Sequence, residues 1–141
     1  MKIFNVSYHD KDILDEVYAI SGKPFGFWAG LKRGGTGTPR GTLAEAPEQV
    51  LEKFRHIESI RYCSLREMQE GMLLYFNRRL ETYAIPVNRK EIKVLRWRKS
   101  GGRAGPVLEL TTTYGHSFAI QYNRGYIKSM NKFLQRFGGI G

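Results

Sequence analysis

The sequence has one cysteine, three histidines and no long apolar run, and each of these shortages excludes a class of protein. Cys63 has no second cysteine to pair with inside the chain, so no disulfide framework is expected. The histidines, at positions 9, 56 and 116, do not have the spacing of metal ligands, and we expect neither a metal nor another cofactor. No apolar run approaches the ~20 residues of a membrane-spanning helix. We therefore expect no membrane partner.

Length and composition indicate one globular domain. The 141 residues suffice for one buried core but not for two, so we take residues 1–141 as a single domain. Hydrophobic residues make up 41% of the chain and charged residues 26%, which argues against a disordered protein. The first residues lack the basic start, apolar stretch and cleavage site of a secretory signal, so we expect a cytoplasmic location.

Acidic residues are scarce in the second half of the chain. The sequence has 23 basic and 13 acidic side chains, a net charge of +10, and residues 77–141 hold thirteen basic and three acidic ones. A positive field concentrated on part of a surface attracts polyanions, because neutralised phosphates release their counterions. RNA or DNA is therefore the expected partner. The alternatives are an acidic protein surface and a basic surface that only keeps the protein soluble.

The first half of the chain is predicted to hold two short strands and three helices. Strands are expected over residues 2–8 and 25–31. Asp10 is placed to cap a helix that Gly22 ends. A second helix is expected to begin after Pro47, with an apolar face made of Val50, Leu51, Phe54, Ile57 and Ile60.

The strongest local helix signal is the run Ser64-Leu65-Arg66-Glu67. A serine followed three residues later by a glutamate is typical of a capping box, in which both side chains bind backbone amides at a helix start. Apolar residues then recur at helical spacing as far as Tyr83. The sequence thus predicts a third helix over residues 64–83.

After Pro86 the apolar residues alternate with polar ones. Strands are predicted over residues 91–99, 106–113 and 117–122, and their short connections favour an antiparallel meander. A final helix is expected over residues 126–137. The predicted fold is α+β, with a mainly antiparallel sheet that includes this C-terminal three-stranded meander and is packed on one side by about four helices.

Alternation in the predicted meander places Arg96 and Arg98 on the polar face of the sheet, away from Leu95 and Trp97. Arginine suits phosphate because its planar guanidinium makes bidentate contacts. The predicted nucleic-acid-binding set extends this face to neighbouring cations and comprises Arg96, Arg98, Lys99, Arg103, Arg124, Lys128 and Lys132. The alternative is an ordinary cross-strand charge cluster of Arg96 and Arg98 with Glu109.

A glycine-rich loop at about residues 30–43 is the second candidate site. Lys32, Arg33 and Arg40 supply charge, and successive glycines present backbone amides, so this loop is predicted to contact phosphate. Long loops are disproportionately functional. The loop could instead be a flexible connector or a cradle for a nucleotide or an acyl carrier.

No catalytic residue is assigned, and the sequence favours a binding protein over an enzyme. We expect a small basic accessory protein that binds nucleic acid, of a kind that phages or mobile elements encode. The first alternative is an inhibitor that docks on an acidic protein. The second is a metal-free ribonuclease using His116 and Tyr114, since the predicted element order is similar to that of small bacterial toxin ribonucleases.

Overall fold

The computed structural model describes residues 1–8, 10–32, 36–55, 61–98 and 105–137. Within these ranges the strands are β1 (Phe4–Asn5), β2 (Gly41–Glu45), β3 (Tyr62–Glu67), β4 (Gly71–Arg78), β5 (Glu81–Asn88), β6 (Ile92–Arg98), β7 (Val107–Thr112) and β8 (Ser117–Gln121). The α-helices are α1 (Lys11–Ser21), α2 (Phe27–Lys32), α3 (Glu48–Leu51) and α4 (Ile127–Arg136), and the 3₁₀ turns are η1 (Glu52–Phe54), η2 (Arg89–Glu91) and η3 (Arg124–Tyr126). The protein is therefore α+β, as predicted. None of the described helices has the length and apolar character needed to cross a bilayer.

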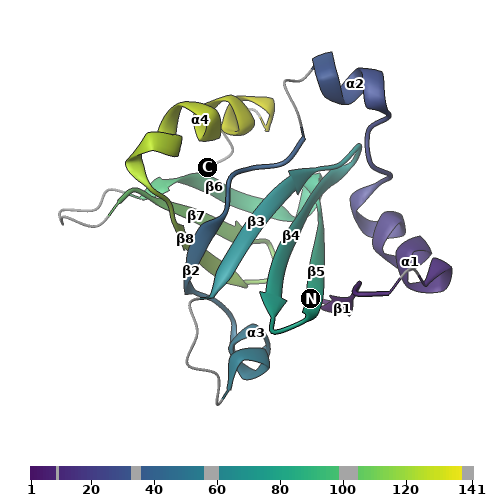
Figure 1. Cartoon of the computed structure of the whole chain (residues 1–141). Coiled ribbons are helices and arrows are strands. Elements are labelled where there is room, and N and C mark those ends of the chain that lie inside the picture. The colour runs from purple at the N-terminus through teal and green to yellow at the C-terminus, as the bar shows by residue number, and fades with distance from the viewer. Residues whose placement is uncertain (9, 33–35, 56–60, 99–104, 138–141) are drawn as a thin grey trace.

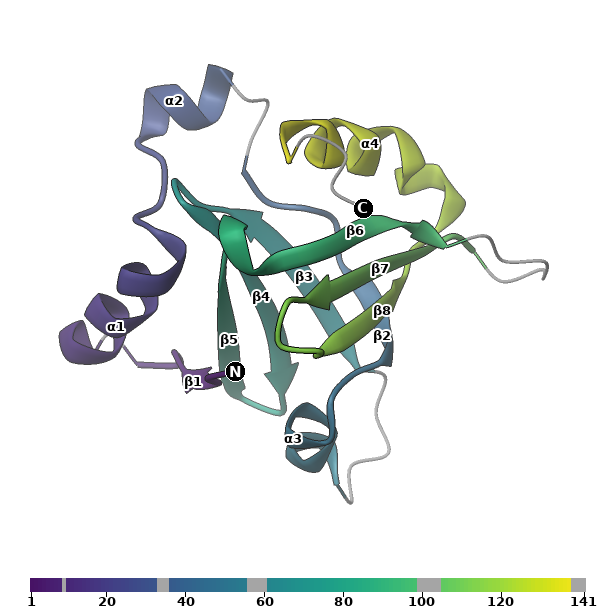
Figure 2. The same ribbon diagram turned by 180° about the vertical axis from the view of Figure 1, so that it is seen from behind.

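All eight strands belong to one antiparallel sheet in the order β1-β5-β4-β3-β2-β8-β7-β6. The sheet curls, so that the inward side chains of β3–β5 and of β6–β8 meet in one core (Figures 1 and 2). Leu65, Leu74, Leu108 and Phe118 are among the most deeply buried members of this core. This burial of apolar area is the main source of stability.

The helices lie on different sides of the sheet, not on one side as predicted. Met130 and Phe133 of α4 join the inner core, and α4 lies over one end of the curled sheet (Figure 1). Val17 of α1 instead packs outside the sheet, against Leu73 of β4 and Met68. A curled sheet has an inner and an outer apolar area, and one layer of helices cannot cover both.

Several predicted elements are found. Asp10 caps α1, because its Oδ1 accepts hydrogen bonds from the backbone N–H groups of Asp12 at 2.9 Å and Ile13 at 3.4 Å. Gly22, at a φ of 78°, ends this helix. The strands expected after Pro86 are found as β6, β7 and β8, and the last predicted helix is found as α4.

The predicted helix over residues 64–83 is wrong, because this segment forms β3, β4 and the start of β5. Along β3 the residues alternate between half-buried and buried, which is the period of a strand. Ser64 points outward and Glu67 inward, so neither makes the capping box that the local sequence suggests. Pairing of β3 with β2 and β4 outweighs the local helix signal.

Three shorter predictions also need correction. The strand expected over residues 25–31 is replaced by helix α2, and the helix expected after Pro47 ends at Phe54 after one α-helical and one 3₁₀ turn. Ile57 and Ile60, which were expected on its apolar face, lie outside the described residues. The glycine-rich loop contains the start of β2, and Gly37 makes an isolated bridge with Arg66.

Candidate functional site

The two arginines of β6 point outward as predicted, but carboxylates hold both of them. Arg96 Nε lies 3.7 Å from Glu109 Oε2. Arg98 donates two hydrogen bonds to Glu45, at 3.0 and 3.2 Å, and its Nε lies 4.0 Å from Glu109. Two positive and two negative charges therefore meet on this part of the sheet, which is the cross-strand cluster considered as the alternative. Both β6 arginines therefore have carboxylate partners.

The remaining predicted cations lie in different parts of the molecule. Arg124 of η3 and Lys128 and Lys132 of α4 are exposed and make no ion pair with any residue of the described ranges. Arg40 is also exposed, and its guanidinium carbon lies 3.9 Å from the centre of the Tyr62 ring. Lys32 is the last residue of α2. Arg33, Lys99 and Arg103 lie outside the described residues.

Strand pairing brings Arg40 and Arg124 to the same end of strands β2 and β8. Thr42 of β2 is paired with Tyr62 of β3 on one side and with Gln121 of β8 on the other. Arg40 precedes this row by two residues, and Arg124 follows it by three. The two arginines, predicted as members of separate sites, therefore lie at the same end of paired strands.

A shallow open hollow of about 480 Å³ lies beside this row. Its lining residues are Thr42, Gly105, Gln121, Tyr122, Asn123 and Arg124. Two glycines allow the backbones around it to approach closely: a Cβ on Gly41 would lie 2.6 Å from Ile120 Cγ2, and one on Gly105 would lie 2.0 Å from the Tyr122 carbonyl oxygen. A side chain at either position would collide with β8 or the residue that follows it.

A second arginine and tyrosine meet further along the same outer face. Arg66 of β3 and Tyr75 of β4 both point outward, and Tyr75 is opposite Ser64 in the strand register. Burial beside α1 raises the pKa of Tyr75 above its ordinary value, while a hydrogen bond and the positive charge of Arg66 act in the opposite direction. The tyrosine therefore stays neutral and keeps a polar contact with the guanidinium.

We call these outward residues, Arg40, Tyr62, Arg66, Tyr75 and Arg124, the arginine–tyrosine face. In Figure 1 the outer side of β2 and β3 is turned toward the viewer, and no helix of the described part of the chain crosses it. The outward positions from Arg40 to Thr42 and from Tyr62 to Arg66 carry no acidic side chain. The face therefore presents permanent positive charge beside aromatic rings.

Sequence reasoning missed Tyr62, Arg66 and Tyr75 as site residues. Arg66 and Tyr75 fall in the predicted helix over residues 64–83, in which Arg66 lies away from the apolar stripe and Tyr75 lies on it, and Tyr62 precedes that helix. The signal that could have found them is the alternation of Tyr62, Ser64 and Arg66 with Cys63, Leu65 and Glu67. Trp97, in contrast, packs inward as expected, and its Nε1 donates a hydrogen bond to Asn131 Oδ1 at 2.8 Å.

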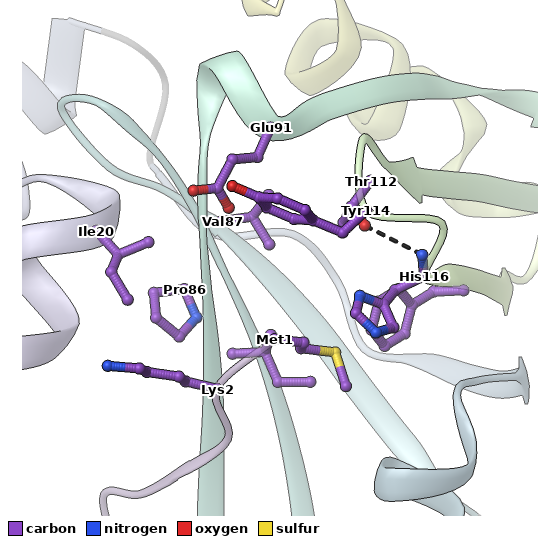
Figure 3. Close-up of a pocket in the computed structure, with 11 residues that line it drawn as sticks. Met1, Lys2, Ile20, Pro86, Val87, Glu91, Thr112, Tyr114 and His116 are labelled. Carbon is purple, nitrogen blue, oxygen red and sulfur yellow. Dashed lines mark hydrogen bonds between the residues drawn. The ribbon is translucent and has the colours of Figure 1, made fainter.

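A second hollow, of about 230 Å³, lies between β5, the β7–β8 turn and the N-terminal residues (Figure 3). Glu91, Tyr114 and His116 supply polar groups in it, and the Glu91 carboxylate and the Tyr114 ring point toward each other. The His116 backbone N–H donates to Thr112 Oγ1 at 3.1 Å, while its Nδ1 is buried without a hydrogen-bond partner in the described residues. Lys2 lines this hollow but no arginine does.

In the described part of the chain we find neither a metal-binding group of side chains nor a reactive thiol. No group of three histidine, cysteine or carboxylate side chains there could hold a metal ion. Cys63 is buried, and burial raises the pKa of its thiol to about 12. No family model, curated protein or solved structure gives a significant match to this chain.

Proposed function

We propose that this protein binds nucleic acid through the arginine–tyrosine face. The observation that carries the proposal is the Arg40 guanidinium, which lies 3.9 Å from the centre of the Tyr62 ring, where no described helix crosses the outer side of β2 and β3. A guanidinium over the face of an aromatic ring still has N–H groups that can donate to another partner. Such a group is oriented in advance to donate two hydrogen bonds to one phosphate.

The distribution of charge supports a polyanionic partner. Residues 22–44 and residues 110–141 each contain four basic and no acidic side chains. Pairing of β2 with β8 brings these two segments side by side. Arg40 and Arg124 of these two segments therefore add positive charge at the same end of the sheet, whereas the charges on β6 are balanced by Glu45 and Glu109.

Contacts of this kind are made to the phosphate backbone and are independent of base sequence. We therefore expect RNA and DNA of random sequence to bind, with an affinity that falls steeply as salt rises. Arg124 borders the open hollow, and Lys128 and Lys132 carry the positive surface onto α4. These three residues of the predicted set remain part of the proposed interface.

Fluorescence anisotropy with labelled 20-nucleotide RNA and DNA strands tests the proposal. We expect the variant Arg40→Glu/Arg124→Glu to bind at least about tenfold more weakly, because two favourable charge contacts become repulsive. The slope of log affinity against log salt should become shallower by about 0.7 for each single-strand phosphate that the variant no longer binds. The matched control Lys11→Glu/Lys93→Glu changes the net charge equally at exposed positions away from the face, and it should keep most of the affinity.

An equal loss of affinity in both double variants would mean that only net charge matters, and it would overturn the proposed site. Failure of the wild-type protein to bind any strand at low salt would overturn the function itself and favour an acidic protein partner. Arg40→Lys keeps the charge but not the planar group stacked on Tyr62. It should bind more weakly than the wild-type protein if bidentate contacts are made.

A further inference from the structure

Two large aromatic side chains of α2 are exposed to solvent. Phe27 is 73% exposed and Trp28 is 75% exposed. Their rings meet edge to face with centres 5.3 Å apart, so neither ring is buried by the other. Adjacent exposed aromatic rings of this size are characteristic of surfaces that bind a partner.

The position of α2 connects these rings with the arginine–tyrosine face. A Cβ on Gly30 would lie 3.8 Å from Thr36 Cγ2, and the Thr36 carbonyl oxygen accepts a hydrogen bond from the backbone N–H of Glu67 at 2.7 Å. The next residue, Gly37, forms a bridge with Arg66. The aromatic helix therefore adjoins the end of β3 that carries Arg66. Figure 1 shows α2 beyond this end of the sheet, on the side of the molecule where α4 also lies.

The segment of the chain that contains α2 has basic but no acidic side chains. The helix belongs to the acid-free segment 22–44, and Lys23, just before it, is exposed. A surface that combines accessible rings with positive charge fits a ligand that has both flat apolar groups and negative charges. Single-stranded nucleic acid has both, because its bases are free to stack while its phosphates are exposed. In a duplex the bases are already stacked on one another.

We propose that the protein selects single-stranded nucleic acid, with unpaired bases stacked on Phe27 and Trp28 and the backbone running along Arg66 and Arg40. This inference rests on the proposed function and names the class of strand that the same interface takes. The two rings provide stacking that tolerates any base, and the arginines provide charge that tolerates any sequence. The protein then distinguishes single strands from duplexes and does not distinguish one base sequence from another.

Tryptophan fluorescence and anisotropy test this inference. The chain has two tryptophans, and Trp97→Phe leaves Trp28 as the only one. Titration of that protein with a 15-nucleotide oligo-dT should quench its emission, whereas the matched duplex should leave the emission nearly unchanged. Phe27→Ser/Trp28→Ser, in the otherwise wild-type chain, should weaken oligo-dT binding at least about fivefold and leave duplex binding unchanged. Leu80→Ser, which removes an apolar side chain that is 98% exposed in the β4–β5 turn, is the control and should change neither.

The outcomes separate the two proposals. If the wild-type chain binds neither strand nor duplex, the proposed function fails. If it binds oligo-dT but the Phe27→Ser/Trp28→Ser variant binds it equally well, nucleic-acid binding stands and the stacking role is wrong. The last titration uses vesicles of phosphatidylcholine with phosphatidylglycerol. A blue shift of Trp28 on these vesicles, with no response to oligo-dT, would assign α2 to an anionic membrane surface instead.

Discussion

Arg98 of β6 forms a paired hydrogen bond with Glu45 of β2, in which Nη1 lies 3.0 Å from Oε1 and Nη2 lies 3.2 Å from Oε2. Strands β7 and β8 separate these two residues in the sheet, so the two side chains meet over the strands between them. Arg98, which the sequence predicts as a phosphate ligand, is thereby paired with a carboxylate. The arginine–tyrosine face, on β2 to β4, becomes the better candidate.

This pair gives a prediction about protonation. The pKa of Glu45 lies below its ordinary value, mainly because of the hydrogen bond from Arg98 and then because of its positive charge. Arg98→Ala should therefore raise that pKa in an NMR titration of the carboxylate. A carboxyl whose folded pKa is lowered stabilises the protein above its unfolded pKa, and this contribution is lost as pH falls through the folded pKa. The stability difference between wild type and Arg98→Ala should therefore be largest near neutral pH and shrink in acid. An unchanged Glu45 pKa would contradict the pairing.

A second ion pair holds α4 to the sheet. The Glu67 side chain is 1% exposed, and its Oε1 lies 3.6 Å from Arg136 Nη1. Arg136→Ala leaves the buried carboxylate with less compensation and should lower the free energy of unfolding by about 3 kcal/mol. Lys132→Ala, at an exposed position of the same helix, should change it by less than about 0.5 kcal/mol. Urea denaturation measures both, and equal effects would show that this pair contributes little.

The β4–β5 hairpin depends on the absence of a side chain at Gly71. A Cβ there would lie 2.0 Å from the Val87 carbonyl oxygen, and the backbone of a paired strand cannot easily move away. Gly71→Ala should therefore destabilise the protein by at least about 2 kcal/mol. Gly37→Ala is the control, because nothing lies within 4 Å of its Cβ position. If the two variants unfold at the same midpoint temperature, this close packing is contradicted.

Cys63 should be inert in the folded protein. Its thiol is buried with a pKa raised to about 12, so almost no thiolate forms between pH 7 and pH 9. We expect a disulfide reagent such as DTNB to react with it slowly in buffer and rapidly in denaturant. Fast reaction in the native protein would mean that β3 opens readily.

The hollow at Glu91, Tyr114 and His116 should not cleave RNA. Metal-free cleavage needs a group that stabilises the negative charge of the transition state. Lys2 is the only lysine or arginine among the described residues that line this hollow, and the Glu91 carboxylate in the same hollow repels a phosphate. Labelled RNA incubated with excess protein and EDTA should therefore remain intact. Cleavage that disappears in His116→Ala would contradict this expectation and restore the ribonuclease alternative.

The sequence predicts the features of this site whose signals act between residues close together in the chain. Asp10 and Gly22 mark the ends of α1 because a cap needs only neighbouring residues. The alternation around Arg96 and Arg98 predicts correctly that both point outward. It cannot predict Glu45 as their partner, because Glu45 reaches them only through the pairing of β2 with β8.

By itself, the sequence determined the excess of positive charge, the α+β class, helices α1 and α4, and strands β6 to β8. Caps, helical stripes and strand alternation act between residues a few positions apart, so they can be read locally. Only the tertiary structure decided that residues 62–88 form strands, and that Arg40, Tyr62, Arg66 and Arg124 share one face. The reason is physical: strand pairing joins distant segments, and it overrides a local capping signal worth about 1 kcal/mol when the paired strands bury a core.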